Sequence, residues 1–479
     1  MDQKIELQRY CDDRARLRTL SYASRALLIS FALLASYLLP PFDASAKADS
    51  FTAPWADALV RWDVFHFAQI ARGGYQYEHQ WAFFPGLPWL LRATALSERE
   101  YLLGGALLVL LCDTTLVLYD LSLIILSNRD AALLSAMLSL LPSSPATLRL
   151  VPYAEPFFTY LSYRGMLFCA RKQWLYAAIS FALASAFRSN GVTLAGFLLW
   201  GMLIAPFLGG RARAIRLTTV IRCIIYIALV FAPFAYHQYT GYQAFCLTSM
   251  DAPLVSTDAP SASTDTPPTS TTRPEWCTNT LPLIYSHVQS AYWNVGFLRY
   301  WTLQQLPNFV IAAPPLASIM AFAWWHLRRT VPGYAAVLGG YAVKGKPAAA
   351  LSSPAAPATS SASAASTSPA SSATSTSYTA RTTTSPSLSP FLSPALTPHV
   401  LHATFMALVL IFASHVQIVL RFAAAMPATY WAGAWLLVRG RCAGGDSMPW
   451  AWAGRAWVAW SVVWGALSVL LWVAFLPPA

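Results

Sequence analysis

The sequence predicts an all-α protein that crosses a membrane many times. Of its 479 residues, 56% are apolar and only 11% are charged, whereas soluble domains carry roughly 25% charged residues. Long apolar segments recur along the chain with short basic clusters beside them, as membrane topology requires. Aromatic residues, which favour the membrane interface, make up 14% of the chain. This composition argues against a soluble multidomain enzyme.

The net charge of +12 would suit a nucleic-acid-binding protein if the basic residues formed a continuous patch. They fall instead in short clusters that flank the apolar segments. We therefore expect the membrane as a partner and no nucleic acid.

The apolar segments predict about ten or eleven transmembrane helices with the N-terminus in the cytosol. Residues 1–24 form a polar, basic cytosolic tail, and residues 25–329 form the membrane core with luminal loops 41–100 and 237–305. Most of the 32 Lys and Arg residues then lie on the cytosolic side, as the positive-inside rule requires. The predicted spans are residues 25–40, 101–127, 131–150, one ending at Arg171, one ending at Arg188, 192–208, 219–236, 306–327, 400–420, 424–438 and 453–476.

Residues 330–398 predict a low-complexity insert on the cytosolic side. From residue 347 onward this segment is nearly all Ala, Ser, Thr and Pro, and Arg381 is its one charged residue. Such a composition cannot bury enough apolar surface to fold, so we expect disorder there. Residues 399–479 then form the C-terminal transmembrane helices.

The seven cysteines do not show the spacing of a metal site. Only one acid lies in the Trp62-Asp63 motif, so we expect no bound metal, although Asp57 and Glu78 leave a metal site open. Cys246 and Cys277 share one hydrophilic loop. They can form a disulfide if that loop faces an oxidising compartment.

Residues 61–88 are too polar for a span and too aromatic for an ordinary loop. Asp63 and His66 are three positions apart and share a face if the segment is helical. An acid among aromatic rings such as Trp62 and Phe67 loses solvation, and it can then take a proton from a hydroxyl. The alternative is a surface Asp that caps a helix.

Polar residues at the edge of the membrane are costly and are therefore candidates for function. On the predicted topology they gather at the luminal ends of the spans. This group comprises Asp63, His66, Glu78, Glu155, Arg188, His287, Trp293, Asn294, His415, Gln417 and Arg421.

Several of these side chains suit a phosphate group. Gln417 and Arg421 are four positions apart on one helical face and, with His415, place hydrogen-bond donors at the end of a span. Arg421 and Arg188 are also expected simply as arginines that extend to the interface. Glu155, between two prolines, either orients a sugar hydroxyl or caps the next helix.

The sequence shows no Gly-rich phosphate loop, no zinc spacing and no Ser-His-Asp arrangement. It also lacks a soluble nucleotide-binding domain. An enzyme built on this chain would take its donor substrate from the membrane.

These motifs resemble the PIG-V family of GPI mannosyltransferases, in the form typical of fungi. The resemblance runs from residue 61 to about residue 431. It rests on Arg61-Trp62-Asp63 with His66, Tyr77-Glu78-His79, Ala82-Phe83-Phe84-Pro85-Gly86, Pro152-Tyr153-Ala154-Glu155-Pro156, Arg188-Ser189-Asn190-Gly191, Tyr292-Trp293-Asn294-Val295-Gly296-Phe297, Gln305-Leu306-Pro307-Asn308-Phe309 and His415-Val416-Gln417-Ile418.

The resemblance implies a GT-C glycosyltransferase fold in the endoplasmic reticulum membrane, with a catalytic first luminal loop. It implies transfer of the second mannose, in α-1,6 linkage, from dolichyl phosphate mannose to a GPI precursor with inversion, and a small accessory membrane subunit. No other cofactor is implied. We expect Trp62, Asp63 and His66 to be catalytic, with Asp63 as the base. Substrate-binding residues are expected to be Glu78, Glu155, Arg188, Asn190, Trp293, Asn294, His415, Gln417 and Arg421.

Three other functions remain open. Another dolichol-dependent mannosyltransferase would act on a different acceptor, although the Trp62-Asp63 and Phe83-Phe84-Pro85-Gly86 pair favours the family above. A lipid or solute transporter often shows internal repeats and polar groups at the membrane midplane, and this sequence shows neither. A non-catalytic membrane scaffold is a further alternative.

Overall fold

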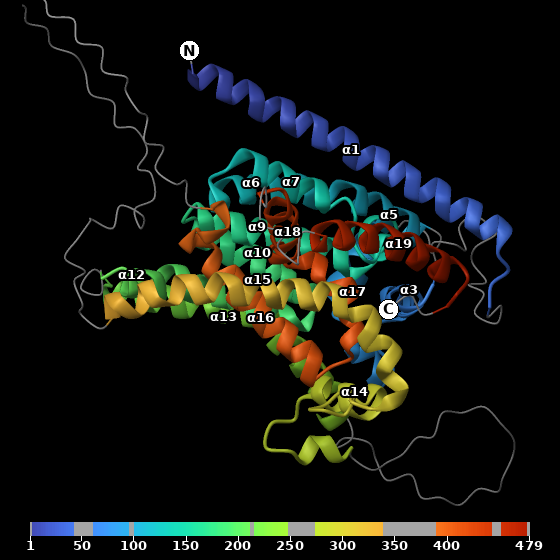
Figure 1. The fold of residues 1–479 in the computed structure, drawn as a ribbon. Helices are drawn as coiled ribbons and strands as arrows, with labels where there is room; N and C mark the ends of the chain where they lie inside the picture. The colour runs from blue at the N-terminus through green and yellow to red at the C-terminus, as the bar shows by residue number, and fades with distance from the viewer. Residues whose placement is uncertain are drawn as a thin grey trace, which may run out of the picture.

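The computed structural model describes residues 2–42, 61–94, 100–210, 215–247, 274–338, 389–442 and 452–476. Within these ranges the chain forms helices and no β-strand, which confirms the predicted all-α class. Figure 1 shows these helices gathered in one bundle, with α14 (Ile284–Trp293) set apart beside one end of it.

Seven helical segments are long and apolar enough to cross a membrane. They correspond to seven of the spans that the sequence predicted. Their bounds are Lys4–Leu38, Leu102–Leu126, Ser189–Leu208, Leu217–Leu247, Leu303–Gly333, Pro394–Phe412 and Ala453–Val473. The named helices within them are α1 (Asp2–Leu38), α5 (Glu100–Leu111), α6 (Thr114–Leu126), α11 (Ala195–Leu199), α12 (Ala205–Leu208), α13 (Leu217–Tyr242), α15 (Leu306–Leu338), α16 (Thr397–Phe412) and α19 (Ala453–Val473).

The other predicted spans correspond to shorter helices. Helices α9 (Ala154–Ala170), α10 (Trp174–Phe187) and α18 (Pro427–Cys442) have 17, 14 and 16 residues. The predicted span 131–150 is not one helix, because α7 (Arg129–Leu138) ends before a Ser- and Pro-containing turn and α8 (Pro145–Arg149) follows it. Proline cannot donate the backbone hydrogen bond that would continue a helix through this turn.

Helix α1 continues through the boundary that the sequence placed between a tail and a first span. Its N-terminal half packs on α6 and α7 (Figure 1), where Arg129 binds both carboxylate oxygens of Asp13 and Leu17 is fully buried. Further along α1, Arg25 donates to the carbonyls of Val109, Leu110 and Cys112. These carbonyls lie at the end of α5 and just after it, where the regular i to i+4 hydrogen bonds of the helix stop.

Ordered structure extends into the predicted insert 330–398 from both ends. Helix α15 extends to Leu338, and residues 389–396 form short 3₁₀ turns that lead into α16. Phe391 and Leu396 are buried in the core, and His326 of α15 hydrogen-bonds the Phe391 carbonyl at 2.9 Å. These apolar anchors explain why the end of the tract is ordered. Disorder was predicted for residues 347–398, and it is wrong for residues 389–398, which are helical or in 3₁₀ turns. Residues 347–388 lie outside the described residues.

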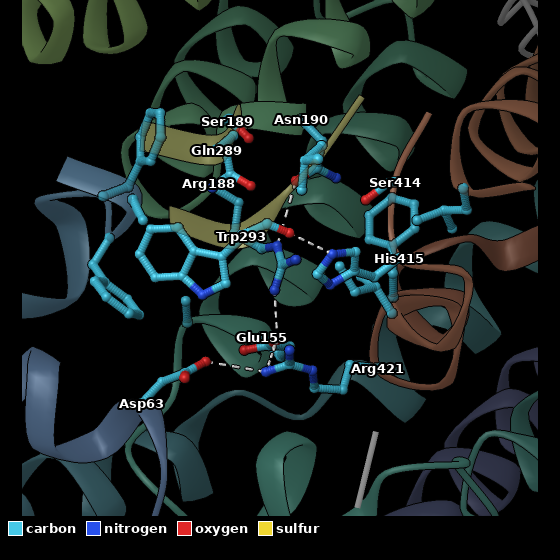
Figure 2. Close-up of a pocket in the computed structure, with 18 of the residues that line it drawn as sticks. Asp63, Glu155, Arg188, Ser189, Asn190, Gln289, Trp293, Ser414, His415 and Arg421 are labelled. Atoms are coloured by element: carbon cyan, nitrogen blue, oxygen red, sulfur yellow. Dashed lines mark hydrogen bonds and ion pairs between the residues drawn. The ribbon is translucent and has the colours of Figure 1, made fainter. Parts of the chain in front are cut away.

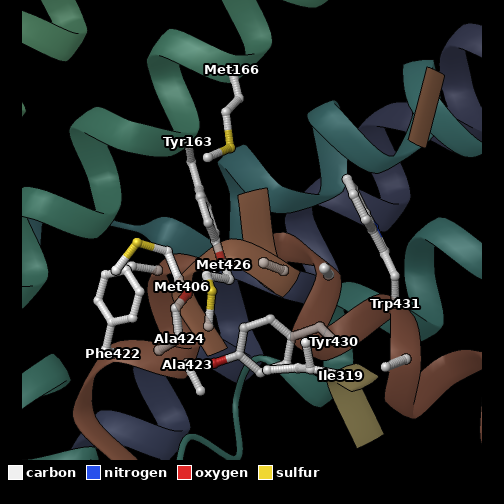
Figure 3. Packing of buried hydrophobic residues seen from close by; sticks show 14 of the residues in the cluster. Tyr163, Met166, Ile319, Met406, Phe422, Ala423, Ala424, Met426, Tyr430 and Trp431 are labelled. Carbon is white, nitrogen blue, oxygen red and sulfur yellow. Dashed lines mark hydrogen bonds between the residues drawn. The ribbon is translucent and has the colours of Figure 1, made fainter. Parts of the chain in front are cut away.

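The largest hydrophobic core joins α6, α9, α10, α15, α16 and α18. Figure 3 shows its packing around the irregular segment between α16 and α18, with Tyr163 and Trp431 on either side. The Tyr163 hydroxyl donates to the Ala424 carbonyl, and Trp431 Nε1 donates to Ser122 Oγ at 2.7 Å. The core therefore holds a segment that is not a regular helix, and this segment carries α17 (Val419–Phe422) with Arg421.

Candidate functional site

A cavity of about 670 Å³ opens where the irregular segments of the fold meet. This volume lies within the range of small-molecule sites. Its wall is drawn from α3 (Asp63–Gly73), residues 82–84, the start of α9, the end of α10, α14, the end of α16 and α17. Figure 2 shows the charged and polar side chains that project into it.

Asp63 is the first residue of α3 and points into the cavity (Figure 2). Val64, Phe67 and Ile70 of this helix are buried. The segment is therefore helical, which is the condition under which Asp63 and His66 share a face. Asp63 is not enclosed by aromatic rings as expected. Its side chain is 34% exposed and its Oδ2 lies 3.1 Å from Nη1 of Arg421.

Arg421 bridges the two acids of the cavity. The same Nη1 donates to the Tyr153 hydroxyl at 3.1 Å and lies 4.0 Å from Oε1 of Glu155. The guanidinium is therefore shared between the carboxylates of Asp63 and Glu155. The sequence had predicted a phosphate as its partner.

Glu155 and Arg188 form a second ion pair. The Glu155 side chain is only 3% exposed, and that of Arg188 is 22% exposed. Arg188 also donates from Nε to Oδ1 of Asn190 at 3.4 Å. The cavity thus contains two carboxylates and two guanidinium groups whose charges balance, because a buried acid is stable only with a partner.

Several buried polar atoms around the cavity have no hydrogen-bond partner. They are Glu155 Oε2, Asn190 Nδ2, Gln417 Oε1 and Arg421 Nε. Buried polar groups in proteins are nearly always paired. This set contains both donors and acceptors, as a site for a ligand that both donates and accepts hydrogen bonds requires.

His415 lines the cavity. Its Nε2 donates to the Trp293 carbonyl at 2.7 Å, because a carbonyl oxygen can only accept. Burial lowers the pKa of His415 below its ordinary value of 6.5, and the hydrogen bond to the carbonyl opposes this only in part. The role of His415 as a phosphate donor stays a prediction, and its Nε2 hydrogen is already used by the Trp293 carbonyl.

Four predicted site residues do not line the cavity. Trp62 stacks on Phe475 with ring centroids 5.1 Å apart, and His66 stacks on Phe83 at 4.7 Å. Burial lowers the pKa of His66. Asn294 adopts a left-handed conformation (φ 52°) and ends α14, a position that Asn tolerates better than most residues.

Glu78 is the fourth of these residues. Its two carboxylate oxygens accept from Trp276 and Tyr292, and Glu78 is not among the residues that line the cavity. The predicted residues that do line the cavity are Asp63, Glu155, Arg188, Asn190, Trp293, His415, Gln417 and Arg421.

The structure adds cavity residues that the sequence did not single out. Tyr285 and Gln289 lie on α14 at four-residue spacing before Trp293, so one face of α14 meets the cavity. Ser189 donates to the Tyr285 hydroxyl at 2.7 Å. The spacing from Trp293 was a signal that could have identified Tyr285 and Gln289.

Cys246 and Cys277 form the predicted disulfide, with Cα atoms 5.7 Å apart. It joins the segment after α13 to the segment before α14. Among the residues that the structure describes, no three His, Cys, Asp or Glu side chains are grouped as a metal site would require.

Comparison with known proteins identifies the family of this chain. The family model described as Mannosyltransferase (PIG-V) matches residues 18–479. A protein of Cryptococcus neoformans named GPI mannosyltransferase 2 is 30% identical over 95% of this chain and 96% of its own length.

Two mammalian proteins named GPI alpha-1,6-mannosyltransferase 2 are also similar. The protein of Cricetulus griseus is 35% identical over 63% of this chain and 64% of its own length, and the protein of Homo sapiens is 32% identical over 68% and 72%. No solved structure matches the chain. The family model and the near-complete match to the Cryptococcus protein show that this chain belongs to the mannosyltransferase (PIG-V) family.

Proposed function

We propose that this protein transfers the second mannose, in α-1,6 linkage, from dolichyl phosphate mannose to a GPI-anchor precursor. Membership of a mannosyltransferase family supports the reaction class, and the names of the relatives supply the GPI acceptor and the linkage. The observation that carries the mechanism is the Asp63–Arg421 pair, which faces a ligand-sized cavity.

The cavity suits a donor that is both a phosphate and a lipid. Arg188 and Arg421 supply positive charge, and Val409, Leu410 and Phe422 line the cavity beside them. An apolar wall next to guanidinium groups fits a phosphate attached to a hydrocarbon chain. The proposed reaction is written without a metal ion, with Arg188 and Arg421 as the cations that face the phosphate.

In the proposed reaction, the acceptor hydroxyl oxygen attacks C1 of the mannose while the C1–O bond to phosphate breaks. Asp63 takes the hydroxyl proton, and the electron pair of the broken bond leaves on the phosphate oxygen. Attack opposite the leaving group inverts a β-linked donor into an α-linked product.

The total charge of the cavity and the donor does not change during this step. Asp63 becomes neutral as it gains the proton, while the phosphodiester monoanion becomes a monoester dianion. Arg421, which pairs with Asp63 before the reaction, is released from that partner as the leaving phosphate gains its second negative charge. Stabilisation of charge that develops in the transition state is a major source of catalysis.

The unpartnered polar atoms fit the sugar better than the phosphate. A phosphate accepts hydrogen bonds only, whereas mannose hydroxyls both donate and accept. Gln417, Glu155 and Asn190 all line the cavity. After a small rotation of each side chain, Gln417 Oε1 and Glu155 Oε2 can accept from hydroxyls and Asn190 Nδ2 can donate to one. We therefore assign these three residues to the mannosyl group.

The proposal includes a location in the endoplasmic reticulum membrane with the cavity on the luminal side. The Cys246–Cys277 disulfide supports that side, because disulfides persist in oxidising compartments. A small accessory membrane subunit is part of the proposal and rests on the family resemblance alone.

The first test measures transfer of radiolabelled mannose from dolichyl phosphate mannose to a one-mannose GPI intermediate in microsomes. Asp63→Asn should lower the rate by about 10²- to 10⁴-fold, the usual contribution of a general base. The matched control is Asp120→Asn, because Asp120 also pairs with an arginine, Arg14, but does not line the cavity. A wild-type rate in stably expressed Asp63→Asn would remove Asp63 as the base.

The donor and the acceptor are tested separately with the purified enzyme. GDP-mannose should not replace dolichyl phosphate mannose, and transfer from GDP-mannose in the absence of dolichyl phosphate would overturn the donor assignment. An N-glycan precursor in place of the GPI intermediate tests the alternative acceptor. The α-mannosidase sensitivity of the product tests inversion.

A further inference from the structure

Glu78 is held entirely by the segment that precedes and forms α14. Its Oε1 accepts from Trp276 Nε1 at 2.9 Å and its Oε2 accepts from the Tyr292 hydroxyl at 3.2 Å. His287 Nε2 lies 3.5 Å from the same Oε2. Both oxygens therefore have protein partners, and Glu78 does not line the cavity.

The partners of Glu78 are themselves fixed. Trp276 is buried, and the next residue, Cys277, is linked to Cys246 by the disulfide. Trp81, Cys246 and Trp276 belong to one small hydrophobic cluster that includes Ile284 and Val288 of α14. The carboxylate is thus attached to a covalently closed, packed unit.

On its other side, Glu78 belongs to the turn that leads to the cavity wall. Phe83 lines the cavity, stacks on His66 one turn after Asp63, and meets Trp293 with ring centroids 6.3 Å apart. Tyr292, which donates to Glu78, directly precedes Trp293. Glu78 therefore connects the helix that carries Asp63 with the helix that carries Trp293.

We propose that Glu78 is a positioning residue that fixes the Phe83–Trp293 wall relative to Asp63. It does so through Trp276 and Tyr292 without touching substrate. This inference rests on the proposed function for its kinetic test. A misplacement of about 1 Å at a reacting centre can cost about 10² in rate, so loss of this connection should lower kcat more than it raises KM.

The kinetic test compares Glu78→Ala with Glu78→Gln and with Trp276→Phe/Tyr292→Phe, which removes both donors. Glu78→Ala should lower kcat by about tenfold to hundredfold, and Glu78→Gln, which keeps one acceptor oxygen, should recover part of the rate. Glu275→Ala is the control, because Glu275 is an exposed acid on the same segment.

Combining Glu78→Ala with Trp276→Phe/Tyr292→Phe distinguishes positioning from substrate contact. If Glu78 acts through the two donors, the combined variant should be no slower than Glu78→Ala alone. Losses that multiply would overturn the proposal, because Glu78 would then act by another route. An unchanged kcat in Glu78→Ala would overturn it as well.

A second measurement does not depend on mannosyl transfer. Phe83→Cys and Trp293→Cys, with all cysteines except Cys246 and Cys277 changed to Ser, are cross-linked with a short bifunctional thiol reagent. The yield should fall several-fold in the Glu78→Ala background and remain unchanged with Glu275→Ala. An unchanged yield in Glu78→Ala overturns the positioning role, whereas failure of the wild type to transfer mannose overturns only the proposed function.

Discussion

Arg421 donates a hydrogen bond to Asp63, with Nη1 3.1 Å from Oδ2, although the two residues are 358 positions apart. The pair links the first helix of the cavity to the irregular segment between α16 and α18. It also explains how Asp63 can stand at the edge of an apolar region with its charge compensated.

Arg421→Met should lower mannosyl transfer by at least about 100-fold, because Asp63 and the leaving phosphate lose the same partner. Arg421→Lys should recover only part of the rate, since an ammonium group cannot reproduce the fork of a guanidinium. Transfer rates of Arg421→Met, Asp63→Asn and the double variant check this. The double variant should be close to Asp63→Asn alone if the residues act as a unit, and fully multiplicative losses would contradict the pairing. Arg14→Met is the matched control.

Arg188→Met should destabilise the protein by about 3–5 kcal/mol, because it leaves the buried carboxylate of Glu155 without its main partner. The loss of stability should lie near the lower end of this range, because Arg421 Nη1 is 4.0 Å from Glu155 Oε1 and still compensates part of its charge. Thermal unfolding in detergent measures the effect. Adding Glu155→Gln to Arg188→Met should restore part of the stability, and a further loss in that double variant would argue against the ion pair.

Gly191→Ala should disturb the segment that carries Arg188 and Asn190. A Cβ at Gly191 would lie 2.5 Å from Ser185 Cα and 2.7 Å from its backbone nitrogen, and backbone cannot move aside as a flexible side chain can. Overpacking of this kind costs about 1–3 kcal/mol. Gly196→Ala serves as the control in thermal unfolding, because nothing lies within 4 Å of its added Cβ. Equal melting temperatures for both variants would contradict the tight contact.

His415 should make stability depend on pH. Its folded-state pKa is lowered from 6.5 by burial, so below about pH 6.5 the unfolded chain binds more protons than the folded protein. This contribution to stability is complete above pH 6.5 and is lost as the pH falls from there toward the lowered pKa of the folded state. Unfolding measured between pH 7.5 and about pH 5 should show a smaller loss in His415→Gln than in the wild type. An identical pH profile would remove His415 as the source.

The sequence anticipated the local elements of the site better than their partners. Composition singled out residues 61–88, which contain the helix that begins at Asp63, and the apolar segments around them, because such patterns depend on neighbouring residues. The same reasoning placed Trp62, Glu78 and Asn294 in the site. In the structure, Trp62 stacks on Phe475, Glu78 accepts from Trp276 and Asn294 ends α14. Polar character at a membrane edge does not reveal which way a side chain points.

The boundaries of the helices were also predicted only in part from the sequence. Hydropathy identified residues 101–127 as one apolar unit, but the structure has two helices there because Asp113 accepts a hydrogen bond from the Leu116 amide and begins α6. The sequence did not predict the 3₁₀ turns near Phe391, because they lie in a Ser- and Pro-rich tract. Their order depends on burial against α15, which no local pattern contains.

The sequence by itself determined the all-α membrane architecture, the disulfide pair and the family, because composition, periodicity and motifs can be read along the chain. Only the tertiary structure decided that Asp63 pairs with Arg421 and that Glu155 pairs with Arg188. It also decided that Glu78 binds Trp276 and Tyr292 and does not itself line the cavity. These contacts join segments far apart in sequence. Their geometry is set by how the helices pack, and a carboxylate at such a junction takes whichever partner that packing brings within hydrogen-bond distance.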